Sequence, residues 1–193
     1  MALTSGFFDS VNLDRTYNAD QFSSFYDGLI IDGVYSSVGN RFRVAVSSGM
    51  QLTVDTGRAW FDHVWVANTS KYTLTISTAD TVYPRIDAVI IEINKQDRKS
   101  YLKVVNGTPA ANPSRPSLIK TNLVRQYALA YVTVPVNATS ISSGNIDNVV
   151  GNVETPLVSF LNITGLPPMQ YSETDINAGS TPLYTGTLYL VYE

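Results

Sequence analysis

The chain has 193 residues, of which 44% are hydrophobic and 15% are charged, and its formal net charge is −3. This length suits one sizeable domain, or one domain with a small appendage. The low charged fraction leaves the surface to Ser, Thr, Asn and Tyr, which suits protein packing or carbohydrate contact and also occurs on ordinary β-sandwiches. The lack of a basic cluster argues against a nucleic-acid partner, and the lack of cysteine excludes disulfides and thiolate metal sites.

One amphipathic helix is predicted near the start of the chain, over roughly residues 19–31. Its apolar residues form a single stripe with the spacing i, i+3, i+4 and i+7, and they are Phe22, Phe25, Tyr26 and Leu29. Asn18 and Gln21 are spaced to form a capping box, and Gly33 is a plausible stop. The stripe packs either on the domain's own sheet or on a neighbouring subunit.

After Gly33 the pattern changes to short strands and turns. Phe42, Val44 and Val46 alternate with small or polar residues, which predicts a strand with one buried face. Residues 58–61 and 64–67 are separated by Asp62-His63, which predicts a tight hairpin. We expect Trp60 and Trp65 near the core of this hairpin.

The strongest β signal covers residues 85–94 and 100–105, separated by a polar turn. In the first segment, Ala88 and Ile90 lie on one face, while Val89 and Ile91 lie on the other. Apolar residues on both faces predict a central strand that is covered on both sides. The two segments together predict a β-hairpin.

The second half of the chain continues with loops and strands. Residues 106–117 contain three prolines, which predicts an ordered surface loop. A strand is predicted over residues 127–134, with Tyr127, Leu129 and Tyr131 on one face. A short helical turn capped by Ser143 is expected within residues 143–150, and a last strand over residues 187–192.

These elements predict a mainly β fold: an antiparallel β-sandwich-like domain with one N-terminal α-helix and a short helical turn near residues 143–150. Residues 1–34 are expected to form an N-terminal attachment segment and helix. Residues 35–150 are expected to form the sandwich-like core. Residues 151–193 are expected to form a C-terminal extension that ends in a strand.

The sequence offers little for catalysis. His63 is the single histidine, and a tight hairpin turn usually exposes such a residue rather than making it a general base. The scattered Asp residues of the N-terminal fifth are explained by caps and turns. Phosphate-binding glycine motifs and calcium-loop spacing do not occur in the sequence. We therefore predict a protein that is not an enzyme and has no catalytic residue, cofactor or metal.

Three segments of the chain are distinctive. They are the opening, residues 5–19 (SGFFDSVNLDRTYNA); the middle block, residues 84–109, with its following Pro-rich loop, Tyr-x-Leu-Ala strand and the turn of Ile141 with Ile146-Asp147; and the ending, residues 178–193. These segments resemble tail and baseplate proteins encoded by phages and prophages of Gram-positive bacteria. The family often has an arginine after this turn, whereas the present chain reads Asn148-Val149-Val150-Gly151.

The resemblance implies a virion structural protein that acts by oligomeric assembly and by attachment to neighbouring tail proteins. We expect a homo-oligomer, either a trimer or a ring, made in the bacterial cytoplasm without a signal peptide and without membrane insertion. A second hypothesis is a receptor-binding protein, or adhesin, that contacts host cell-wall saccharide.

Two adjacent aromatic residues precede the predicted helix. Because successive side chains of an extended chain face opposite ways, Phe7 and Phe8 cannot both enter one small core unless a bend buries them. With the helix residues they make up the predicted assembly interface, which is Phe7, Phe8, Phe22, Phe25 and Tyr26.

Overall fold

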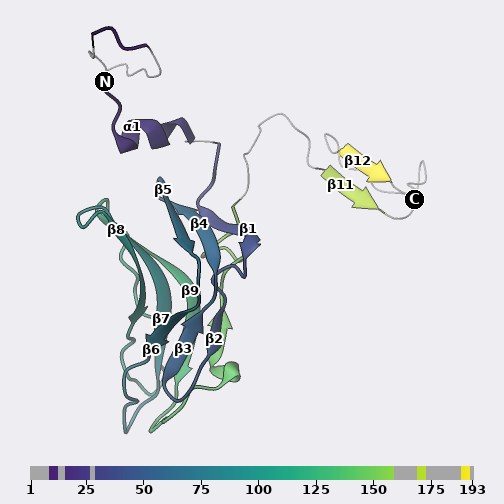
Figure 1. Ribbon diagram of the computed structural model, residues 1–193. Helices are drawn as coiled ribbons and strands as arrows, with labels where there is room; N and C mark the ends of the chain where they lie inside the picture. The colour runs from purple at the N-terminus through teal and green to yellow at the C-terminus, as the bar shows by residue number, and fades with distance from the viewer. Residues whose placement is uncertain (1–8, 13–15, 27–28, 159–168, 173–187, 192–193) are drawn as a thin grey trace. The chain divides into compact units, whose positions relative to one another are not determined.

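Figure 1 shows the computed structural model, which describes residues 9–12, 16–26, 29–158, 169–172 and 188–191. The chain divides into two compact units, Met1–Phe160 and Leu161–Glu193. Strands make up 44% of the residues that the structure describes and helices 8%, which confirms the predicted mainly β class. In the second unit, β11 (Met169–Ser172) pairs in parallel with β12 (Leu188–Val191), where the last strand was expected.

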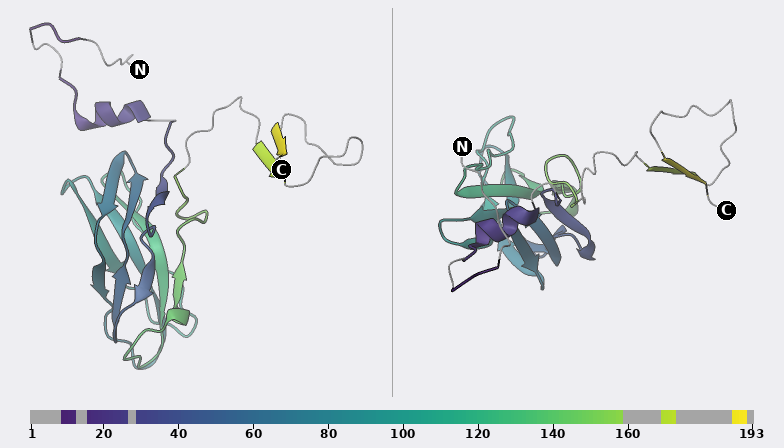
Figure 2. Two further views of the ribbon diagram at one scale, coloured as in Figure 1. Left: turned by 45° about the vertical axis from the view of Figure 1, so that its right-hand side comes forward. Right: turned by 90° about the horizontal axis from the view of Figure 1, so that it is seen from above.

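The described part of the first unit contains antiparallel sheets with the strand orders β1-β4-β5, β2-β3-β6 and β10-β9-β7-β8. The strands are β1 (Gly33–Gly39), β2 (Val44–Val46), β3 (Gln51–Val54), β4 (Gly57–Phe61), β5 (Val64–Asn68), β6 (Tyr72–Thr75), β7 (Arg85–Asn94), β8 (Lys99–Val105), β9 (Val124–Val134) and β10 (Ile146–Asn148). Figures 1 and 2 show β7, β8 and β9 in one layer and β1 to β5 in the other. The main core lies between them, since it contains buried residues from both layers.

Strand β7 is the predicted central strand. It lies between β8 and β9 and forms the expected hairpin with β8. Val89, Ile91 and Ile93 enter the main core, whereas Ala88 and Ile90 belong to a second buried cluster on the opposite face. Leu118, which directly follows the proline-rich segment, helps to cover this second face, because it packs against the second cluster.

The pairing of β7 with β9 contains a register shift between Val89 and Ile90. Leu129 lies in the main core, whereas Tyr131 belongs to the second cluster on the other face. The prediction that these two residues share a face is therefore wrong. A bulge adds one residue to the strand and reverses the in–out alternation that follows it.

The hairpin of β4 and β5 forms as predicted, with Asp62 and His63 at its turn. Their φ angles are 49° and 68°, as a tight two-residue turn requires. The expectation that Trp60 and Trp65 lie near the core is wrong. They face each other across the two strands on the outer side, and Trp65 is 61% exposed. Phe61 and its neighbour Ala59 occupy the core instead.

The N-terminal helix begins where predicted and ends earlier. The Asn18 side chain accepts the Gln21 N–H at 2.8 Å, and the Gln21 side chain accepts the Asn18 N–H at 3.0 Å, which completes the capping box. Helix α1 (Ala19–Ser23) then tightens into the 3-10 turn η1 (Ser24–Tyr26). The hydroxyls of Ser23 and Ser24 donate to carbonyls one turn earlier, and such bonds compete with helix continuation.

Two smaller expectations also change. Phe42 is buried, but it lies before β2 with a φ of 54°, so only residues from Val44 onward form the strand. The helical turn η2 (Ser143–Asn145) follows Ser142 rather than Ser143 as its cap and leads directly into β10. The turn is therefore shorter than the predicted range.

The end of the first unit returns to its beginning. The N–H of Val34 donates to the carbonyl of Pro156 at 2.9 Å, and the N–H of Val158 donates to the carbonyl of Val34 at 2.8 Å. Gly33 permits this approach, because a Cβ there would meet the Pro156 carbonyl oxygen at 2.6 Å. Residues 155–158 are thereby held beside β1.

Candidate functional site

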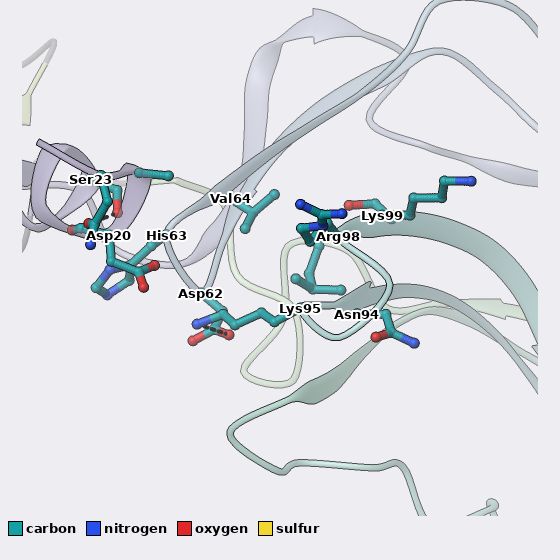
Figure 3. A pocket seen from close by; sticks show the side chains of 13 residues that line it. Asp20, Ser23, Asp62, His63, Val64, Asn94, Lys95, Arg98 and Lys99 are labelled. Carbon is teal, nitrogen blue, oxygen red and sulfur yellow. Dashed lines mark hydrogen bonds and ion pairs between the residues drawn. The ribbon is translucent and has the colours of Figure 1, made fainter.

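Two hollows lie where α1 and η1 pass the turn between β4 and β5. The larger, which we call the polar hollow, has a volume of about 580 Å³ (Figure 3). The smaller, which we call the aromatic hollow, has a volume of about 500 Å³. They adjoin, since four residues line both: Ala19, Ser23, His63 and Val64.

The aromatic hollow is lined by rings from the helical segment and from the outer face of the β1-β4-β5 sheet. They are Phe22, Tyr26, Tyr35, Trp60 and Trp65. The Tyr26 ring meets the Trp60 ring edge-on, with 5.5 Å between centroids, and this contact joins the helical segment to the sheet. Phe22 and Phe25 pack against Tyr26 and remain 58% and 56% exposed. Together with Trp65, they leave a largely exposed aromatic surface.

Arg58 is the charged residue of this surface. Its guanidinium carbon lies 5.8 Å from the centroid of the Tyr35 ring and 5.6 Å from that of the Trp65 ring. Both contacts are within the range of cation–π attraction, so the rings hold the guanidinium in place. Within the described ranges, no Asp or Glu lines the aromatic hollow and Arg58 forms no ion pair. Its charge is therefore available to a carboxylate or phosphate from outside.

The polar hollow is lined by charged side chains from the hairpin turns (Figure 3). The carboxylate of Asp62 forms an ion pair with Lys95 at 2.9 Å and a longer one with Arg125 at 3.7 Å. Arg98 comes from the turn between β7 and β8, Lys99 is the first residue of β8, and neither forms an ion pair in the described part of the chain. Among the described residues, the cations of the two hollows thus have no ion-pair partner except for Lys95, in a chain whose net charge is negative.

A half-buried tyrosine, Tyr127, positions the turn between the hollows. Tyr127 stacks on Phe61 with 4.0 Å between ring centroids, and its hydroxyl donates to Asp32 at 3.0 Å. The other oxygen of Asp32 accepts the N–H of Asp62 at 3.0 Å. Burial raises the pKa of Tyr127, and the negative charge of Asp32 raises it further. The hydroxyl therefore stays protonated and continues to donate at neutral pH.

The structure brings together three of the five predicted interface residues. Phe22, Phe25 and Tyr26 form one aromatic group beside Trp60, while Phe7 and Phe8 lie outside the described residues. Sequence analysis missed Arg58, Tyr35 and the outward position of Trp65. The alternation along β4 indicates that Arg58 and Trp60 share a face, but not which face is outside.

The described residues contain no group of three or more side chains that could hold a metal ion. His63 lies in the predicted turn and lines both hollows. Aromatic rings and a guanidinium support noncovalent recognition, through apolar contact, cation–π attraction and pairing with an anion. None of the helices in the described ranges is long and apolar enough to cross a membrane.

Comparison with known proteins found no matching family model, no similar curated protein and no similar solved structure. The resemblance to phage tail proteins therefore stays a prediction from the sequence.

Proposed function

We propose that this chain is a structural protein of a phage tail or baseplate, which acts by oligomeric assembly and by attachment to neighbouring tail proteins. The resemblance of its opening, middle block and ending to such proteins motivates the proposal. In this proposal the protein is part of the virion and catalyses no reaction.

The observation that carries the proposal is the exposed aromatic surface of the helical segment and the β4–β5 hairpin. Phe22, Phe25 and Trp65 are each more than half exposed, although they lie beside one another around Tyr26 and Trp60. Contiguous exposed apolar surface is typical of protein interfaces, and Trp, Tyr and Arg are enriched among residues that dominate binding energy. An assembly contact would remove these rings from water.

Virion composition tests this function directly. Virions of the phage or prophage that encodes the chain are purified, and the protein is sought by mass spectrometry in a stoichiometric amount. The expected result is a fixed copy number per tail. Absence from purified virions, combined with a monomeric native mass of the purified chain, would contradict the proposal.

A second candidate function is binding of host cell-wall saccharide. The specific observation in its favour is the paired Trp60 and Trp65 next to Arg58, because flat rings and a guanidinium offer stacking surface and donors to a sugar. Adsorption of the purified chain to host cells should then fall after Trp65→Ala. Tyr83→Ala is the matched control, since Tyr83 is 46% exposed and lines neither hollow. Equal adsorption of both variants and the wild type would remove this candidate.

A further inference from the structure

We propose that the aromatic hollow is an interface between two copies of this chain, in which Arg58 of one copy pairs with Asp20 of the other. The inference rests on the proposed function, because it names the partner and the charge pair of the same surface.

The cation of the proposed pair is Arg58 in the aromatic hollow. Among the described residues, the lining of the aromatic hollow contains Arg58 and no carboxylate that could neutralise its guanidinium. Burying this charge without a partner would be costly, whereas a carboxylate can form two parallel hydrogen bonds with it. The chain has 16 acidic residues and 13 basic residues, so a second copy offers carboxylates in excess.

The anion of the proposed pair is Asp20 in α1. Asp20 is exposed in the first turn of α1 and lines the polar hollow (Figure 3). Its carboxylate forms no ion pair in the part of the chain that the structure describes. Asp20 follows Ala19, which lines both hollows, so the unpaired anion lies next to the aromatic surface that carries the unpaired cation.

The patch that carries both residues can pair with the same patch on a second copy. A two-fold interface uses the same patch on both copies, so a contact from residue i to residue j is repeated from j to i. A patch with one unpaired cation, one unpaired anion and aromatic rings meets this requirement by itself. Two Arg58–Asp20 pairs would then flank a central cluster in which Trp65 loses its exposure to water.

The test is sedimentation velocity of the full-length chain over a range of concentrations. The wild type is expected to form a concentration-dependent dimer or a larger assembly that contains it. Arg58→Glu and Asp20→Arg should each weaken association at least about tenfold, because each places like charges opposite one another. The double variant should restore association, since it exchanges the two charges.

Arg43→Glu is the matched control. The substitution changes the net charge by the same amount as Arg58→Glu, and Arg43 is exposed and lines neither hollow. Circular dichroism of every variant verifies that the fold is retained. The inference is overturned by a wild-type chain that stays monomeric, by association that Arg58→Glu leaves unchanged, or by a double variant that does not recover. Stoichiometric presence in virions alongside any of these results would leave the proposed function standing and reject only this interface.

Discussion

Asn148 provides a sharp test of how the two layers of the sandwich are joined. It lies in β10, and its side chain holds the backbone of β2: the Val44 N–H donates to Asn148 Oδ1 at 2.9 Å, and Asn148 Nδ2 donates to the Val44 carbonyl at 3.0 Å. The amide thus imitates a paired strand at the edge of the β2-β3-β6 sheet.

Asn148→Ala should lower the free energy of unfolding by about 2 kcal/mol. Each of the two hydrogen bonds contributes about 1 kcal/mol, and their loss leaves both polar groups of Val44 without this partner. For a unit of this size the melting temperature should fall by roughly 4–8 °C. Urea denaturation followed by circular dichroism measures the free energy, and a thermal scan measures the melting temperature.

The control for this experiment is Asn106→Ala, which removes a single exposed hydrogen bond from Asn106 to Ser77 and should cost less than about 0.5 kcal/mol. Both variants remove the same amide group, so their difference reports the strand-like contact. Equal stabilities of the two variants would refute the argument that the Asn148 side chain joins β10 to β2.

Three further predictions concern buried groups. Tyr127→Phe should cost about 1.5 kcal/mol at neutral pH by removing the bond to Asp32. Because the pKa of Tyr127 is raised above its usual 10.0, the stability that its hydroxyl contributes is fully present below pH 10 and is lost as the pH rises further. The stability of the wild type should therefore fall more steeply at alkaline pH than that of Tyr127→Phe. Burial opposes ionisation of Glu92, but hydrogen bonds from Lys103 and Gln126 outweigh burial and lower the pKa of Glu92 below 4.5. The free energy of unfolding should therefore fall as the pH drops below 4.5, and it should fall less in Glu92→Gln. Acid titration followed by circular dichroism measures both. Gly107→Ala should cost about 2 kcal/mol or more in urea denaturation, because its Cβ would overlap the Ile86 carbonyl oxygen.

The parts of the fold that the sequence predicts best are those in which a local pattern has a single outcome. The hairpin of β7 and β8 is one, because apolar residues on both faces of a ten-residue strand can be satisfied only in a covered central position. The capping box of Asn18 and Gln21 is another, since it depends on residues three positions apart.

The errors have two causes, namely contacts between residues far apart in the chain and local competition for backbone hydrogen bonds. The side of β9 that Tyr131 occupies depends on a bulge opposite β7, which no local pattern in β9 reveals. The end of α1 depends on serine hydroxyls that bond to the backbone, and these compete with an apolar stripe that favours a longer helix.

The candidate site shows the same limit in a form that bears on function. Alternation along β4 divides Arg58 and Trp60 from Ala59 and Phe61, but the size of tryptophan favours placing Trp60 inside. The structure reverses this choice, because Phe61 stacks on Tyr127 and fills the core from its own side of the strand. The outward tryptophans thus follow from the burial of Phe61 between the layers. Aromatic rings that the fold leaves exposed in this way lower the solubility of the protein, and an interface that buries them would remove this disadvantage.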